Sequence, residues 1–308
     1  MIHFLNLIRW KNLLMIALVQ ILIKYALLLP FNQSQGVTTA LSPFAFTILV
    51  LATICIAAGG YVINDIYDIE TDKVNKPNKV IINKYISEKD GYTYFMLLNV
   101  IGVGLGFYLS YLVDYSSLFV VFFMSSALLY IYSTALKQMF LIGNIVVSIV
   151  VALSILVVGI FELIPSMLSI NNVANVPFLE IIRDYAIFAF LINLVREVVK
   201  DIEDINGDHK VGMQTMPIVL GRDRANKIAF VLSLIPLFAV VYYIITSLFT
   251  QQLLVGYFLV FVVAPLIYIT IKIFSAEQQS HYKHISLMLK LVMLTGMLSM
   301  SLYPFILK

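Results

Sequence analysis

Residues 42–72 read SPFAFTILVLATICIAAGGYVINDIYDIETD. The first part, 42–64, is an apolar run long enough to cross a bilayer, for which about 20 mostly apolar residues are needed. It leads directly into Asp65, Asp68 and Asp72, which lie at i, i+3 and i+7 and so share one face of a helix. Carboxylates at the end of a membrane span are costly to desolvate and are usually functional. The stretch therefore predicts a spanning helix that ends in an acidic site.

A second aspartate cluster repeats this spacing. The apolar run 178–198 is followed by Asp201, Asp204 and Asp208, again at i, i+3 and i+7. Of the 17 acidic residues in the chain, four fall in each of the two stretches. A solvated loop with helix-capping acids does not explain the repeated spacing. The repeat suggests two copies of a four-helix unit plus a ninth helix, with the clusters face to face across a central cavity.

The composition is typical of a polytopic membrane protein. The 308 residues are 61% hydrophobic and 12% charged, with a mean hydropathy of +0.96, whereas a soluble domain carries roughly 25% charged residues. We expect an all-α integral membrane protein with one domain, residues 1–308, because no linker or composition shift divides the chain. Nine spans are predicted, at 12–30, 42–64, 92–113, 116–135, 139–162, 178–198, 226–248, 252–274 and 285–306.

Lys and Arg predict the orientation in the membrane, because cytoplasmic loops carry an excess of them. The loop 65–91 contains five lysines, and further Lys and Arg lie between the sixth and seventh spans. The loops 31–41, 163–177 and 249–251 contain neither residue. We therefore predict a multi-pass protein of the plasma (inner) membrane, with its N-terminus and both aspartate clusters in the cytoplasm.

Other residues within the spans suggest structural roles. Lys24 is expected to extend to an interface, as long basic side chains in membrane helices often do. Small residues such as Gly59, Gly60, Gly104 and Gly106 are expected to permit close helix packing.

The chemistry of the clusters favours a hard divalent cation. Two unneutralised groups of three carboxylates would repel each other, and no Cys or His spacing indicates zinc. Mg²⁺ prefers oxygen ligands and is commonly held by one or two carboxylates plus substrate phosphates. Beside an apolar interior, such a site suits a substrate that has a hydrophobic tail and a diphosphate group. The metal would neutralise the negative charge that builds up on the diphosphate as it leaves.

The sequence resembles the UbiA superfamily of intramembrane prenyltransferases, which have two Asp-rich motifs after helices two and six of a nine-helix bundle. The first family motif, N-D-x-x-D-x-x-x-D, is matched from Asn64 to Asp72, and the second, D-x-x-D-x-x-x-D, from Asp201 to Asp208. The family's Arg-Pro-x-Arg-Pro after the first motif is Lys-Pro-Asn-Lys-Val here, at 76–80, so the bidentate grip of arginine is lost. The run 196–208 looks most like the branch of the digeranylgeranylglyceryl phosphate synthases.

The resemblance implies a set of site residues. The six aspartates and Asn64 would bind Mg²⁺, with the aspartates required for catalysis. The substrate-binding candidates are Arg9, Asn12, Asn64, Lys76, Lys79, Tyr132, Lys137, Asn144, Arg196 and Lys200. For Lys76 and Lys79, a role as determinants of membrane orientation remains an alternative, and Tyr132 fits the aromatic belt of a membrane interface equally well.

The implied reaction is Mg²⁺-dependent transfer of a geranylgeranyl-type group from a polyprenyl diphosphate to the hydroxyl of a prenylated glycerol phosphate, giving an ether. The alternative acceptor is aromatic, as in quinone biosynthesis. A remote alternative is a divalent-cation transporter, which would need polar residues along a path through the bilayer. We expect membrane lipids as surroundings, and neither nucleic acid nor an obligate protein partner.

Overall fold

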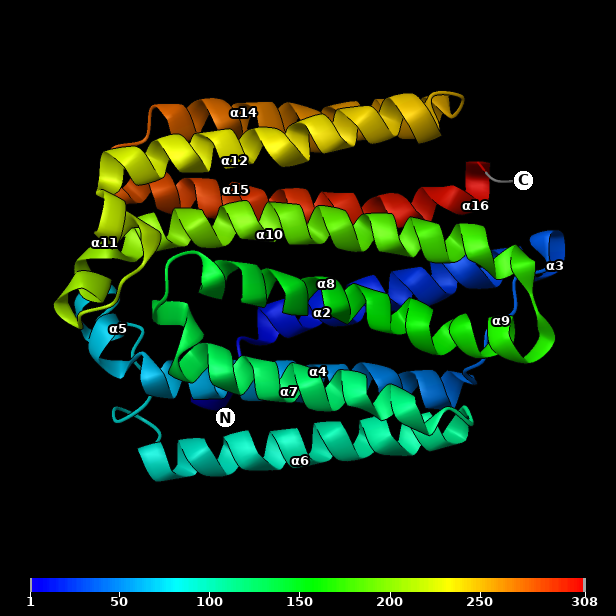
Figure 1. Cartoon of the computed structure of the whole chain (residues 1–308), viewed down its shortest axis with the longest axis horizontal. Helices are drawn as coiled ribbons and strands as arrows, with labels where there is room; N and C mark the ends of the chain where they lie inside the picture. The colour runs from blue at the N-terminus through cyan, green and yellow to red at the C-terminus, as the bar shows by residue number, and fades with distance from the viewer. Residues whose placement is uncertain (1, 307–308) are drawn as a thin grey trace. The chain divides into compact units, whose positions relative to one another are not determined.

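A computed structural model describes residues 2–306, and these residues fold almost entirely into helices (Figure 1). They form no β-strand; one isolated bridge joins Ile82 to Ile86. The chain divides into two compact units. One comprises Met1–Lys137 and Leu153–Ile182, and the other comprises Gln138–Ala152 and Arg183–Lys308. The predicted all-α class is confirmed.

The helices of the first unit are α1 (Ile2–Leu7), α2 (Trp10–Leu22), η1 (Ile23–Leu28), η2 (Leu29–Phe31), α3 (Asn32–Gln35), α4 (Pro43–Tyr67), α5 (Ile69–Asn75), α6 (Glu88–Leu112), η3 (Ser116–Leu118), α7 (Phe119–Thr134), α9 (Ile164–Ile170) and η5 (Val173–Asn175). The unit boundaries fall within η4 (Leu136–Gln138), α8 (Ile142–Glu162) and α10 (Val176–Lys210). The second unit adds α11 (Met216–Leu220), α12 (Arg222–Tyr243), η6 (Ile244–Leu248), α13 (Gln252–Phe258), η7 (Leu259–Val263), α14 (Ala264–Phe274), α15 (Gln279–Leu298), η8 (Ser299–Leu302) and α16 (Tyr303–Ile306).

Eight helical stretches of the described chain are long and apolar enough to cross a membrane. They are Trp10–Gln35, Pro43–Tyr67, Glu88–Leu112, Ser116–Thr134, Ile142–Ser169, Arg222–Leu248, Gln252–Phe274 and Gln279–Ile306. Each contains or overlaps one of the predicted spans. The remaining predicted span, 178–198, lies inside α10 and has Glu180, Arg183 and Asp184 near its start. The count of nine spans therefore stays a prediction.

Glycines let α4, α6 and α7 pack tightly against one another, and these helices lie side by side in Figure 1. A Cβ added at Gly60 of α4 would lie 2.8 Å from Leu129 of α7, and one at Gly106 of α6 would overlap Phe122 of α7. Gly104 has open space around it, so its predicted packing role is wrong. The helix α4 itself runs unbroken past its glycines.

The prediction for Lys24 is also wrong, because its side chain is buried. Its Nζ donates to Glu162 Oε1 at 2.6 Å and to the carbonyl of Leu41 at 2.7 Å. The other carboxylate oxygen of Glu162 accepts from the Leu41 amide at 3.2 Å. The side chains of Lys24 and Glu162 are 2% and 0% exposed. Burial of Lys24 is possible because Glu162, 138 positions away in sequence, compensates its charge.

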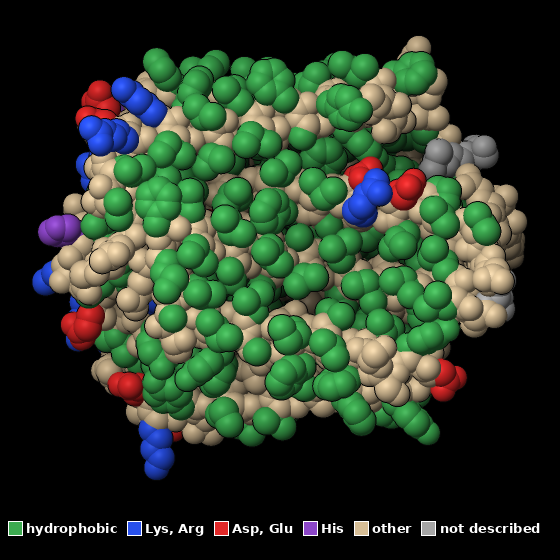
Figure 2. Space-filling view, in the orientation of Figure 1, with side chains coloured by type: hydrophobic (Ala, Val, Ile, Leu, Met, Phe, Trp, Pro, Cys, Tyr) green, Lys and Arg blue, Asp and Glu red, His purple; other side chains and the backbone are tan. Residues whose placement is uncertain are grey.

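The outward faces of the long helices are apolar. Figure 2 shows hydrophobic side chains over most of the visible face, with most of the charged side chains toward the ends of the helices. Phe107 of α6, Phe238 of α12 and Phe274 of α14 are each more than half exposed. In water such extended apolar surface would be unfavourable, whereas in a bilayer it contacts lipid chains. The protein is therefore an integral membrane protein.

Candidate active site

The first aspartate motif lies where α4 ends and α5 begins. Asp68 separates the two helices, with φ −95° and ψ 4°. Its amide still donates to the Asn64 carbonyl at 2.9 Å, and the Asp72 amide donates to the Asp68 carbonyl at 2.8 Å. The chain thus turns at the middle aspartate, which the expectation of one continuous helical face missed. Asp65 stays on α4 and Asp72 is carried by α5.

Asp65 is paired with a basic side chain from the start of the chain. The Nη2 of Arg9 donates to Asp65 Oδ1 at 2.8 Å. Arg9 adopts a left-handed backbone conformation, φ 51°, just before α2, and its guanidinium carbon lies 5.0 Å from the ring centre of Tyr61. Asn12 donates to the Tyr61 hydroxyl at 3.3 Å. Tyr61 was not predicted as a site residue, although its place one turn before Asp65 on α4 is a usable signal.

Asp68 is also engaged by a distant cation. Lys137 Nζ donates to Asp68 Oδ1 at 2.5 Å, and Asn64 Nδ2 donates to Asp68 Oδ2 at 2.6 Å. The side chain of Lys137 is only 7% exposed. The structure thus brings together five predicted site residues of the first unit around the end of α4: Arg9 contacts Asp65, and Asn64 and Lys137 contact Asp68.

The other predicted site residues of this region include Asp72, Lys76, Lys79 and Tyr132. Burial raises the pKa of Asp72 to about 6, and the negative charge of Asp68 adds to this shift while Lys76 opposes it. Lys79 is exposed, and its amide donates to the Lys76 carbonyl in a turn. Tyr132 is half-buried on α7.

The second motif lies on one continuous helix, because 201–208 are all within α10, which runs past the predicted end of the span at 198. Asp201 Oδ2 accepts from Asn144 Nδ2 of α8 at 2.8 Å. Behind Asn144, the Ser148 hydroxyl donates to the Asn144 carbonyl at 2.6 Å and accepts from Asn193 at 3.1 Å. All three of these polar side chains are buried. The Asn144 side chain thus holds Asp201 from α8.

Two predicted phosphate-binding residues have a partner that the sequence analysis missed. Arg196 Nη1 and Lys200 Nζ each donate to the buried carboxylate of Glu197, both at 2.8 Å. The i,i+3 spacing of Glu197 and Lys200 is a recognisable signal for such a pair. Asp204 is half-buried and Asp208 is buried.

The donor chemistry of both motifs suits Mg²⁺, which takes carboxylate and amide oxygens. Within residues 2–306, however, no three His, Cys, Asp or Glu side chains are gathered so that they alone could hold a metal ion. The assignment of the aspartates as ligands stays a prediction.

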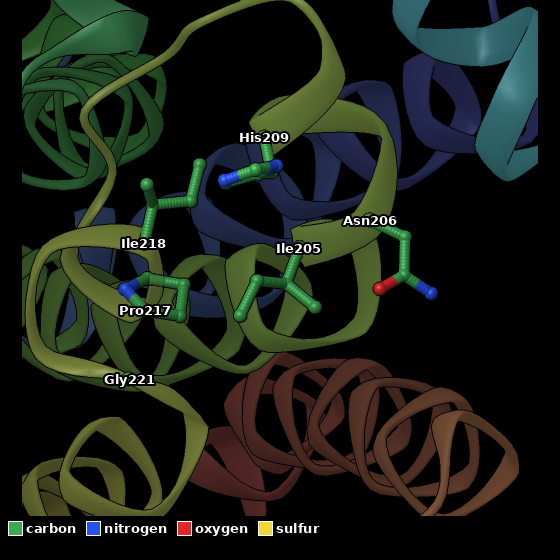
Figure 3. Close-up of a pocket in the computed structure, with 6 residues that line it drawn as sticks. All are labelled: Ile205, Asn206, His209, Pro217, Ile218 and Gly221. Carbon is green, nitrogen blue, oxygen red and sulfur yellow. The ribbon is translucent and has the colours of Figure 1, made fainter.

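A cavity of about 350 Å³ opens beside the second motif. Figure 3 shows its lining, which α10 and the α11 region supply: Ile205, Asn206, His209, Pro217, Ile218 and Gly221. None of the motif aspartates is among these residues, so the cavity is not the predicted metal site.

Comparisons with known proteins agree with the motifs. A model described as the UbiA prenyltransferase family matches residues 33–303. A digeranylgeranylglyceryl phosphate synthase of Methanosphaera stadtmanae is 32% identical over 237 residues, covering 75% of this chain and 78% of that protein.

Two solved structures show the same fold. A digeranylgeranylglyceryl phosphate synthase structure superimposes with a TM-score of 0.61 at 20% identity, covering 97% of this chain and 98% of that one. A UbiA homologue from Archaeoglobus fulgidus, bound to GPP and Mg²⁺, superimposes with a TM-score of 0.55 at 17% identity, covering 97% and 99%. The UbiA-type fold predicted from the aspartate motifs is confirmed, and this chain belongs to the UbiA prenyltransferase family.

Proposed function

We propose that the protein transfers a geranylgeranyl-type group from its diphosphate to the free hydroxyl of a prenylated glycerol phosphate. The C–O bond to diphosphate breaks, an ether C–O bond forms, and diphosphate and the hydroxyl proton are released. The observation that carries the proposal is the 32% identity to a digeranylgeranylglyceryl phosphate synthase across three quarters of the chain. The resemblance of 196–208 to that branch supports the same acceptor.

Mg²⁺ is the proposed cofactor, as in the A. fulgidus homologue. Asn64, Asp65 and Asp68 would hold it at the first motif, and Asp201 and Asp204 at the second, with Asp72 and Asp208 as further or water-mediated ligands. Bound there, the metal would neutralise charge that builds on the departing diphosphate. Residues 1–308 would act as one catalytic domain, since the family match extends through both units.

The basic side chains of the first unit are the strongest candidates for steadying the diphosphate. Arg9 and Lys137 already contact the motif carboxylates, at 2.8 and 2.5 Å. Arg196 and Lys200 share the single negative charge of Glu197, so a phosphate bound by either of them would compete with that carboxylate. We therefore rank them below Arg9 and Lys137 as contacts of the diphosphate.

A reconstituted assay with purified protein, Mg²⁺ and geranylgeranyl diphosphate tests the reaction, with a prenylated glycerol phosphate and an aromatic acid offered separately. Ether product with the glycerol phosphate alone is expected. Product with the aromatic acid alone would contradict the proposed acceptor and favour a quinone-type reaction.

Variants test the roles of the motifs. We expect Asp68→Asn and Asp204→Asn to lose at least about 100-fold in turnover, the scale for losing one electrostatic group at a reacting charge. The matched control is Glu70→Gln, because the Glu70 side chain is 71% exposed and pairs with Lys73 on the surface. Turnover in Asp68→Asn or Asp204→Asn close to that of Glu70→Gln would refute the assignment.

We also propose that the N-terminus and both motifs lie in the cytoplasm of the plasma membrane, on the distribution of Lys and Arg. Single cysteines in a Cys55→Ala background test this orientation. A membrane-impermeant maleimide added to intact cells should label Gln251→Cys and leave Lys84→Cys unlabelled until the cells are permeabilised. The opposite pattern would invert the topology.

A further inference from the structure

The first motif has two carboxylates that are each engaged by one cation from a remote part of the first unit. Arg9 lies 56 positions before Asp65, and Lys137 lies 69 positions after Asp68. Each cation contacts one carboxylate oxygen, Oδ1 in both cases. These are the two acidic residues of the motif for which the structure shows a long-range ion pair.

The two cations are held in place by their surroundings. Arg9 lies against the ring of Tyr61 and is positioned by a left-handed turn, and stacking of this kind favours a planar guanidinium. Lys137 is almost fully buried, and Asn64 holds the second oxygen of Asp68. Both ion pairs are less exposed to water than the Lys73–Glu70 pair, whose side chains are 55% and 71% exposed.

A divalent ion that binds these carboxylates repels the basic side chains beside them, and at Asp68 both carboxylate oxygens are already engaged, by Lys137 and Asn64. A metal that binds Asp65 and Asp68 must therefore weaken or break the contacts of Arg9 and Lys137, and the displaced cations then require new anionic partners in a partly buried place. The oxygens of a diphosphate would supply such partners.

We propose that Arg9 and Lys137 are exchangeable counter-ions of the first motif. They neutralise Asp65 and Asp68 until the donor arrives with its metal, and they then transfer to diphosphate oxygens while the metal takes the carboxylates. This inference rests on the proposed function. It adds that the metal alone binds weakly and that metal and diphosphate bind cooperatively, each strengthening the binding of the other. By linkage the strengthening is equal in both directions.

The test measures binding without turnover. Mn²⁺ affinity is read from the electron paramagnetic resonance signal of the free ion, with and without inorganic diphosphate. For Lys137→Gln and Arg9→Gln we expect Mn²⁺ alone to bind about fivefold tighter or more, the scale of one partly buried ion pair. With Mn²⁺ present, diphosphate should bind the same variants at least about fivefold more weakly.

Two variants serve as controls. Lys137→Arg keeps the charge and should retain the wild-type affinity for Mn²⁺ alone. Lys73→Gln removes one lysine charge from the adjacent surface and should also match the wild type, because Lys73 pairs only with Glu70 among the contacts described. Equal tightening in Lys73→Gln and Lys137→Gln would show a general field effect and overturn the exchange.

Asp68→Asn separates the two hypotheses. One outcome is that Asp68→Asn weakens Mn²⁺ binding while the affinity for Mn²⁺ alone in Lys137→Gln and Arg9→Gln is equal to or below that of the wild type. In that case the metal site stands and the exchange is refuted. If Asp68→Asn leaves Mn²⁺ binding unchanged, the metal does not bind this motif, and both the proposed metal role and the exchange are refuted.

Discussion

Replacing Lys24 by methionine removes the cation of the buried Lys24–Glu162 pair while keeping a side chain of similar length. The variant leaves the Glu162 carboxylate, 0% exposed, without its counter-charge and the Leu41 carbonyl without its donor. Breaking a buried pair by removing one partner costs about 3–5 kcal/mol. We therefore expect the free energy of unfolding to fall by about 4 kcal/mol, close to a thousandfold in the unfolding equilibrium.

Unfolding by sodium dodecyl sulfate in dodecylmaltoside micelles, followed by far-ultraviolet circular dichroism, measures the change. The double variant Lys24→Met/Glu162→Leu removes both charges and should recover at least about half of the loss, because no unpaired charge remains. The control Lys73→Met breaks an exposed pair and should cost less than about 1 kcal/mol. A Lys24→Met variant as stable as Lys73→Met, or a double variant no more stable than Lys24→Met, would refute this reasoning.

Two further predictions concern helix packing and pH. Gly106→Ala should destabilise the protein by about 1–3 kcal/mol in the same unfolding assay, because the new methyl group overlaps Phe122; Gly104→Ala, whose Cβ meets open space, should not, and equal losses would contradict the packing. Because burial and Asp68 raise the pKa of Asp72 to about 6, and Mg²⁺ binds the deprotonated carboxylate, protonation of Asp72 should weaken metal binding as the pH drops through 6. An Asp72→Asn variant with the same pH profile would show that another group titrates.

Hydropathy and charge spacing predicted the spans and motifs because both are local properties. The run ending at Asn64 becomes α4, and Asp201, Asp204 and Asp208 stay on one helix. The break at Asp68 was missed because the sequence around it lacks Pro or Gly, and the helical hydrogen bonds continue across it.

The partners of the charged residues were less predictable from sequence. Nothing local in the sequence indicates that Lys24 meets Glu162, 138 positions away, or that Asp68 meets Lys137. These pairs depend on how the helices fold together. The pairing of Lys200 with Glu197, by contrast, follows from local helix geometry and was available from the sequence.

The length of α10 has a consequence for how lipid substrates are handled. Its 35 residues extend about 52 Å, whereas the hydrocarbon core of a bilayer is about 30 Å thick. With the predicted span 178–198 in the hydrocarbon, the turns that carry Asp201 to Asp208 would reach the head-group layer. A prenyl diphosphate resting in its leaflet already has its phosphates at this depth and its tail among lipid chains. On the proposed function, neither extraction of the lipid into water nor its flipping between leaflets would be needed, and lateral diffusion would deliver it.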